Sequence, residues 1–139
     1  MESTRKKGEL GEKKAKEYLV RSGYTILSAN FFSSFGEIDI VGMKNDVLVF
    51  FEVKSWSTFG SEELERSVNK KKLMRIHKTA EEYRKKFTEY EEKQFQFDLI
   101  FIDISNNEVK HYENISFWPL KGGKMVRISK EIEHYRIEE

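Results

Sequence analysis

The sequence predicts a single α/β domain with a mixed central sheet flanked by helices. Three features indicate this class: two segments have helical periodicity, strongly β-forming runs lie between and after them, and the length of 139 residues suits one domain. The chain has no internal repeat or low-complexity linker, and its one proline, Pro119, comes late. The order of helix, strands, helix and strands therefore favours one layered domain.

The first helix is expected from about Thr4 to Ser22. A partial apolar stripe follows it, formed by Leu10, Ala15, Tyr18 and Leu19. Gly23 suits the position just beyond a helix end, where a left-handed backbone is common. Tyr24–Leu27 then has the composition of a short strand, and the polar and aromatic stretch Asn30–Ser34 predicts a loop.

A β-hairpin is the clearest element of the chain. It combines an alternating strand, a polar turn and a strongly β-forming run, which are Glu37–Val41, Lys44–Asp46 and Val47–Lys54. Because successive side chains of a strand point to opposite faces, Glu52 and Lys54 project side by side. Antiparallel pairing of the two strands allows Asp39 to face them.

The later elements are predicted in the same way. A second helix is expected from about Glu62 to Phe87, where apolar residues recur at steps of three and four. Phe95–Ile104 predicts a third long strand, and a turn then leads into a fourth strand at Val109–Tyr112. Ser129 is expected to cap a short terminal helix.

Asp39, Glu52 and Lys54 are the residue types that metal-dependent hydrolysis of a phosphodiester needs. Mg²⁺ prefers carboxylate oxygens, and a bound divalent ion activates water and polarises a phosphoryl oxygen. The lysine would orient or deprotonate that water, or stabilise charge that builds on the phosphate. The spacing alone equally fits an exposed strand end at which Asp39 forms a salt bridge.

Glu12 is the fourth candidate site residue. It shares a helical stripe with Gly8, Ala15 and Leu19, so it points inward among small and apolar neighbours. An inward carboxylate needs a partner, which a metal shared with the two hairpin carboxylates would supply. The alternative is a glutamate at a helix end whose side chain reaches water.

Composition excludes several classes of protein and site. The chain has no cysteine, hence no disulfide or thiolate metal site, and no apolar run near the roughly 20 residues of a membrane span. The N-terminus lacks the apolar stretch of a signal peptide, so a cytoplasmic protein is expected. Net charge is only +1, yet lysines cluster. Lys13, Lys71 and Lys72 are therefore candidates for nucleic-acid contacts, the alternative being a solvated helix surface.

Other polar and aromatic residues are weaker candidates. Packing or structural roles, rather than catalysis, are expected for the three histidines, His77, His111 and His134. Trp56 and Phe59 are expected to cover the sheet edge rather than to stack on an unpaired base. Asp98 fits either the site or an exposed face of the third strand.

Ordered motifs run from about Gly8 to Phe117. They are Gly11-Glu12-x-x-Ala15-x-x-Tyr18-Leu19, Gly23-Tyr24-x-Ile26-Leu27, Asn30, Gly36-Glu37-Ile38-Asp39-Ile40-Val41, Leu48-Val49-Phe50-Phe51-Glu52-Val53-Lys54 and Phe97-Asp98. This set resembles the YraN-like family, a bacterial group similar to Holliday-junction resolvases within the PD-(D/E)XK nuclease superfamily. The resemblance implies a restriction-endonuclease-like, resolvase-like fold over residues 1–117, with residues 118–139 as a C-terminal extension packed on or trailing from the same domain.

The resemblance also implies roles for individual residues. Asp39 and Glu52 would be metal ligands, Lys54 the catalytic lysine, and Glu12 the additional glutamate of resolvase-like members. The Val53 carbonyl would be a further ligand.

Three more positions are interpreted through the resemblance. Lys72 would be the basic residue that the family has on its second helix. Glu37 belongs to the Gly-Glu-Ile-Asp motif, where it either binds metal or only supports the hairpin. Phe32 stands where the family usually has an arginine, which removes one expected phosphate contact.

The functional hypothesis is an endonuclease that uses Mg²⁺ or Mn²⁺ to hydrolyse DNA, with branched or structured DNA as a candidate substrate. A homodimer is expected, because resolvases act on two strands at once. The alternative is a catalytically silent nucleic-acid-binding or scaffold protein on the same fold, which the near-neutral charge favours. The sequence does not separate DNA from RNA.

Overall fold

The computed structural model describes residues 4–56, 69–120 and 123–136. These ranges contain two α-helices, one 3-10 helix and six strands. In chain order they are α1 (Thr4–Arg21), β1 (Thr25–Ser33), β2 (Gly36–Lys44), β3 (Val47–Trp56), α3 (Lys70–Lys86), η1 (Thr88–Tyr90), β4 (Phe95–Asp103), β5 (Glu108–Leu120) and β6 (Gly123–Arg136).

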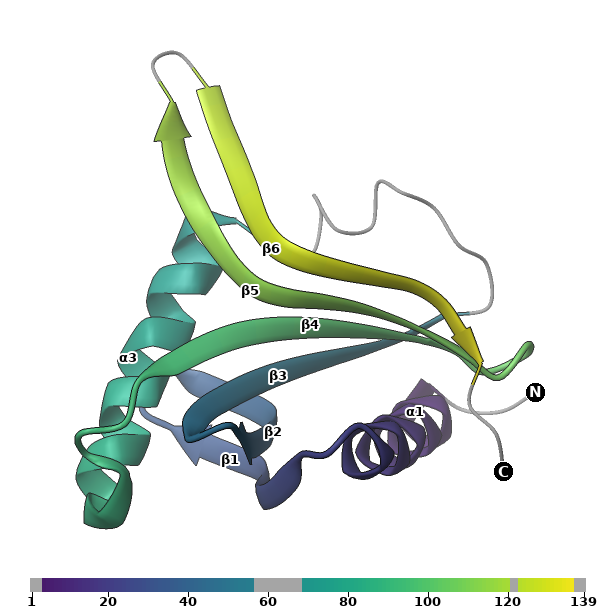
Figure 1. The fold of residues 1–139 in the computed structure, drawn as a ribbon, viewed down its shortest axis with the longest axis horizontal. Coiled ribbons are helices and arrows are strands. Elements are labelled where there is room, and N and C mark those ends of the chain that lie inside the picture. The colour runs from purple at the N-terminus through teal and green to yellow at the C-terminus, as the bar shows by residue number, and fades with distance from the viewer. Residues whose placement is uncertain (1–3, 57–68, 121–122, 137–139) are drawn as a thin grey trace.

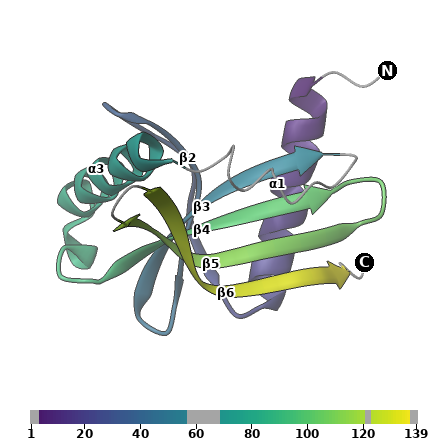
Figure 2. The same ribbon diagram turned by 90° about the horizontal axis from the view of Figure 1, so that it is seen from above.

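The strands form one mixed sheet in which each strand pairs with its neighbours in chain order. β3 and β4 are parallel, because the crossover that contains α3 returns the chain in the same direction. The other described neighbours pair antiparallel. Figure 1 shows β5 and β6 bending away together at one end, and Figure 2 shows the strands side by side from above. The predicted α/β class with a mixed sheet is confirmed.

The two α-helices cover opposite faces of the sheet. Each contributes three buried side chains to its own core: Ala15, Tyr18 and Leu19 from α1, and Ile76, Ala80 and Tyr83 from α3. In β3, Leu48 and Phe50 face α3, whereas Val49 and Phe51 face α1. The two-faced strand that the sequence predicts is therefore confirmed.

α1 approaches β3 closely at Gly11. This glycine is buried, and a Cβ there would lie 1.7 Å from Ser55 Oγ, so a larger residue does not fit. The close approach brings the next residue, Glu12, to the same end of the sheet as the end of β3.

The first strand is longer than the sequence predicts. β1 runs to Ser33, so the expected loop at Asn30–Ser34 is wrong over residues 30–33. These residues pair with β2, and Phe32 lies opposite Glu37. The polar composition of this segment favours a loop when the segment is considered alone. The backbone hydrogen bonds that it forms with β2 outweigh that preference.

The expected terminal helix is also wrong. Ser129 lies inside β6, which pairs with β5 from Gly123 opposite Leu120 to Arg136 opposite Glu108. Without this partner β5 would present a row of unpaired backbone groups at the sheet edge. This segment is a strand because it pairs with the long edge of β5. A helix-capping residue such as Ser129 carries no information about that pairing.

α3 begins at Lys70 and has Asn69 as its N-cap. The Asn69 side-chain oxygen accepts a hydrogen bond from the Lys72 N–H at 2.8 Å, so this residue caps the start of the helix. Residues 62–68 of the predicted helix, Phe59 and the side chains of Trp56 and His134 lie outside the described part. Neither described α-helix is long and apolar enough to cross a membrane.

Candidate functional site

Asp39 lies where β2 and β3 separate. Backbone pairing between these strands ends at Ile40 and Phe51. The Asp39 side chain continues the connection, because its Oδ2 accepts a hydrogen bond from the Val53 N–H at 2.8 Å. The carboxylate is therefore held in the opening between the strands by the backbone next to Glu52.

The surroundings of Asp39 disfavour its charged form. The pKa of its carboxyl rises from the ordinary 3.8 to about 6, chiefly through burial, and the hydrogen bond from Val53 acts in the opposite direction. The negative charges of Glu52, Glu12 and Glu37 raise this pKa further. Carboxyl groups from α1, β2 and β3 thus gather around one point, where a cation would be stabilised.

Glu52 meets two lysines on the side of the sheet that α3 covers. The Lys72 ammonium group contacts Glu52 Oε2, and Lys54 Nζ lies 3.8 Å from Glu52 Oε1. Burial lowers the pKa of Lys72, the contact with Glu52 opposes this, and the charges of Lys54 and Arg75 lower it further. Lys72, expected to contact nucleic acid, is thus placed against Glu52, while 45% of the Lys54 side chain is exposed.

Glu12 enters the same region from α1. Its Oε1 accepts a hydrogen bond from Asn30 Nδ2 at 2.9 Å and lies 3.5 Å from Lys16 Nζ. A surface hollow of about 590 Å³ is lined by acidic side chains and their neighbours, which are Gly8, Glu9, Glu12, Asn30, Phe32, Glu37, Asp39 and Val53. A water molecule occupies about 30 Å³, so this hollow has room for a hydrated ion.

The predicted site residues meet at one end of the hairpin without forming a compact cage. Among the residues that the structure describes, the carboxylate oxygens of Glu12, Asp39 and Glu52 do not all lie within 4.8 Å of one another. Glu52 contacts a lysine of α3, whereas Glu12 contacts an asparagine of β1. Lys13 and Lys71, the other expected nucleic-acid contacts, are exposed on α1 and α3.

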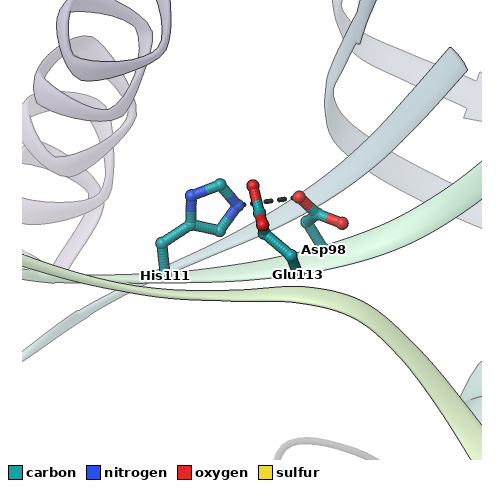
Figure 3. Close-up of side chains that lie close together, drawn as sticks. All are labelled: Asp98, His111 and Glu113. Carbon is teal, nitrogen blue, oxygen red and sulfur yellow. Dashed lines mark hydrogen bonds and ion pairs between the residues drawn. The ribbon is translucent and has the colours of Figure 1, made fainter. Parts of the chain in front are cut away.

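A second cluster of ligand-type side chains lies within the sheet. Over the described ranges, Asp98, His111 and Glu113 form the trio whose potential ligand atoms lie within 4.8 Å of one another. Figure 3 shows these side chains projecting together from β4 and β5. Asp98 and His111 are fully buried, and Glu113 is partly exposed. Two carboxylates and an imidazole are a potential metal-binding set.

Hydrogen bonds already engage both ring nitrogens of His111. Nε2 lies 2.7 Å from Asp98 Oδ2, and Nδ1 lies 2.7 Å from the Tyr18 hydroxyl of α1. A carboxylate oxygen accepts hydrogen bonds, so the His111 Nε2–H donates a hydrogen bond to Asp98 Oδ2. Asp98 Oδ1 also accepts hydrogen bonds from Gln96 Nε2 and the Asn114 N–H, each at 2.9 Å. The protein itself therefore satisfies this buried carboxylate, and a metal ion would have to replace these contacts.

Tyr24 extends this network. Its hydroxyl donates a hydrogen bond to Glu113 Oε1 at 3.2 Å. The pKa of Tyr24 lies well above its usual range, first because of burial and then because of the charges of Asp98 and Glu113. The tyrosine thus stays protonated and remains a hydrogen-bond donor.

Sequence reasoning missed this network. For Asp98 the sequence left two alternatives, the site or an exposed strand face, and its burial rules out the second. The available signal was a pair of polar residues, Asp98 and His111, within apolar strands. His77, expected to pack near the apolar stripe of its helix, is largely exposed on α3, but its ring centre lies 5.2 Å from that of Phe95 and its Nε2 lies 3.8 Å from Glu81 Oε1.

The sequence matches one protein family along most of its length. Residues 11–102 match the model of the uncharacterised protein family UPF0102. The UPF0102 protein of Persephonella marina is 45% identical over 108 residues, which cover 78% of this chain and 90% of that protein. The UPF0102 protein of Fervidobacterium nodosum is 39% identical over 114 residues (81% and 84%), and one from Campylobacter jejuni is 44% identical over 110 residues (79% and 93%). The chain therefore belongs to the uncharacterised protein family UPF0102, the YraN family that its motifs resemble.

Proposed function

We propose that this protein is a metal-dependent endonuclease that hydrolyses phosphodiester bonds of DNA. One observation carries the proposal: Asp39 is held among other carboxyl groups at the open end of a hairpin, with two lysine side chains beside Glu52. Such a group supplies both metal ligands and positive charge for a phosphate. The proposed fold is the restriction-endonuclease-like one, supported by a hairpin followed by a parallel strand and by helices on both faces.

The donor set around Asp39 fits a hard divalent cation. Its charged donors are carboxylate oxygens, which Mg²⁺ and Mn²⁺ prefer. The raised pKa of Asp39 reflects burial and negative charge that a divalent ion would offset. Asp39 and Glu52 would hold the ion, and Glu12 would complete the site.

The side chains would divide the chemistry between them. A bound Mg²⁺ or Mn²⁺ supplies an activated water and polarises a phosphoryl oxygen. Lys54 is exposed enough to reach a substrate and to stabilise charge that develops on its phosphate. Lys72 holds the Glu52 carboxylate from the α3 side, and the Val53 N–H orients Asp39.

DNA, including branched or structured DNA, is the proposed partner, and a homodimer is expected of an enzyme that cuts two strands of a junction. The second candidate is a catalytically silent nucleic-acid-binding protein with the same fold. The net charge of only +1 favours this second candidate, because nucleases that grip long DNA often carry a clearer basic excess.

Cleavage of synthetic four-way junctions, linear duplexes and single strands with Mg²⁺ or Mn²⁺ tests the proposal. The parent should cut at least one of them. Asp39→Asn and Lys54→Ala should each lower the rate by about a hundredfold or more, since metal and charge stabilisation contribute several kcal/mol. Glu92→Gln is the matched control, because it makes the same change from carboxylate to amide at an exposed side chain near the turn at the opposite end of the hairpin.

The outcomes separate the two candidates. Cutting by the parent and the control, but not by the two site variants, supports the nuclease. A parent that cuts nothing, or variants that all cut equally well, would refute it. Binding of the same substrates without cleavage would favour the silent protein.

A further inference from the structure

Exposed apolar side chains gather at the tip of the β1–β2 hairpin and on the adjoining turns of α3. Phe35 at the tip is 44% exposed, and Met74 on α3 is 52% exposed. Both line one surface groove. Single exposed apolar side chains are common, but an aromatic ring and a methionine that share a groove indicate a contact surface.

The rest of this groove is basic. It is lined by two apolar and four cationic side chains, which are Phe35, Lys70, Lys71, Met74, Arg75 and Lys78. No carboxylate in the described part of the chain lines it. Lys78 Nζ lies over the Phe35 ring, 5.4 Å from its centre, so a base would stack on the other face of the ring or displace this side chain toward a phosphate. An exposed ring among four cations suits a polyanion that carries flat rings of its own.

The hairpin tip that presents Phe35 is anchored to α3. The Ser34 N–H and hydroxyl donate hydrogen bonds to the Glu82 carboxylate at 3.1 and 3.2 Å. The Ser33 hydroxyl lies 2.9 Å from Thr79 Oγ1, and the Phe35 N–H donates to Ser33 Oγ at 3.0 Å. These bonds hold the turn without covering the ring, so little ordering is left for a ligand to impose.

Gly36 brings one wall of the groove against the turn. Its φ is +138°, and a Cβ there would lie 3.2 Å from Arg75 Cδ and 3.3 Å from Arg75 Nε. Glycine alone meets both conditions without strain. The Arg75 side chain therefore packs directly beside the turn that carries Phe35.

We propose that this groove, called the stacking groove below, binds unpaired nucleotides, with a base stacked on Phe35 and the phosphates on its four cationic side chains. In a duplex, neighbouring base pairs cover both faces of each base, so a duplex could use the cations but not the ring. The proposal rests on the proposed function in taking nucleic acid as the substrate, and it adds that the bound strand carries unpaired bases.

The stacking groove adjoins the candidate site through the chain at two points. Lys71 precedes Lys72, whose ammonium group contacts the carboxylate on β3. The turn at Phe35 leads into β2, which carries Asp39. Phe32, which is 73% exposed, lines the hollow that contains Asp39. A strand that runs from the groove toward this hollow would carry unpaired nucleotides to the bond to be cut, as at a branch point or overhang.

Binding measured in EDTA tests the stacking groove without any cleavage. Fluorescence anisotropy would compare a labelled oligothymidylate of about 15 nucleotides with a duplex of the same length. Phe35→Leu should weaken single-strand binding about tenfold and duplex binding less than about twofold, because only the stacking face is lost. Phe35→Trp should keep the single-strand affinity. Circular dichroism should show that both variants remain folded, since Phe35 lies outside the core.

Charge and position have their own controls. Lys78→Gln should weaken binding of both oligonucleotides. It should also reduce the salt dependence, which for about four phosphates of a single strand has a log–log slope of about −3. Arg21→Gln removes an exposed charge in the last turn of α1 and should change neither affinity.

Each remaining outcome has one meaning. Equal losses for single strand and duplex in Phe35→Leu, or no loss for either, would overturn the stacking groove. A membrane surface is the other outcome. If the parent binds vesicles of equal parts phosphatidylcholine and phosphatidylglycerol but no oligonucleotide, and Phe35→Leu loses the vesicle binding, the stacking groove is overturned and the surface is assigned to membranes. If Phe35→Leu weakens single-strand binding more than duplex binding but the parent cleaves nothing under any condition, the nuclease is refuted and the stacking groove is supported. If the parent cleaves DNA and Phe35→Leu binds both oligonucleotides as the parent does, the nuclease is supported and the stacking groove is refuted.

Discussion

Replacing Asp39 with asparagine should stabilise the metal-free protein at neutral pH and leave its stability unchanged in acid. The pKa of this carboxyl is about 6 in the folded protein, against an ordinary value of 3.8. A carboxyl whose pKa is raised by folding binds its proton more tightly in the folded state, so its ionisation lowers stability. The loss is absent below 3.8, grows between 3.8 and about 6, and is complete at higher pH.

The magnitude follows from the rise in pKa. An increase from 3.8 to about 6 corresponds to about 3 kcal/mol, at about 1.4 kcal/mol for each pH unit. Asparagine keeps an oxygen that can accept the hydrogen bond from Val53 and removes only the charge. Asp39→Asn should therefore add up to about 3 kcal/mol at about pH 7.5 and little near pH 4. A divalent ion should reverse this order, because it stabilises the carboxylate of the parent.

Urea unfolding in EDTA, from about pH 4 to about pH 8, measures this difference directly. Glu92→Gln is the control, since it makes the same change from carboxylate to amide at an exposed side chain near the turn between β2 and β3. Its difference from the parent should not grow over this pH range. A difference for Asp39→Asn that is constant with pH, or a variant that becomes less stable than the parent as pH rises, would refute the reasoning from burial and charge repulsion.

Three further changes test single contacts, each by urea unfolding at neutral pH. Lys72→Met should lower the free energy of unfolding by about 2 kcal/mol, because the carboxylate on β3 loses its ammonium partner; an unchanged value would contradict the pairing. His111→Phe should lower it by about 3 kcal/mol, because the buried Asp98 Oδ2 loses its hydrogen-bond partner while Oδ1 keeps its two donors. Adding Asp98→Asn should restore part of that loss. If the effects of the two substitutions on the free energy of unfolding simply add, Asp98 and His111 do not depend on each other and this reasoning is wrong. Gly36→Ala should cost about 1–3 kcal/mol, and Arg75→Ala in the same chain should relieve the contact but not the strain at a φ of +138°.

The hairpin of the candidate site could be predicted because its signals are local. Alternation along Glu37–Val41 indicates a strand with two faces, and the turn residues Asn45 and Asp46 adopt positive φ values of 52° and 66°. The inward position of Glu12 follows from steps of three and four along one helix. These patterns depend only on near neighbours in the chain, and the structure reproduces them.

Partners that are distant in the chain could not be predicted in this way. Lys72 looked like an exposed helix lysine, and its contact with Glu52 exists only because α3 packs across the strand that carries Glu52. Asp98 looked equally suited to a surface or a site. Its burial depends on His111 and on the Tyr18 hydroxyl, which lies 93 residues before that histidine in the chain.

Periodicity and motif order along the chain were enough to establish the family, the mixed α/β class and the residue types of the hairpin site. They could do so because spacings of two, three and four residues report which face a side chain occupies. The pairing of β5 with β6, the extension of β1, the gathering of carboxyl groups around Asp39 and the stacking groove beside α3 followed from packing alone. The two strand pairs join neighbours in the chain, and their extent depends on pairing across the sheet that composition does not report. The carboxyl groups and the groove join segments far apart in the chain, so the assembled sheet and its two helices had to bring them together.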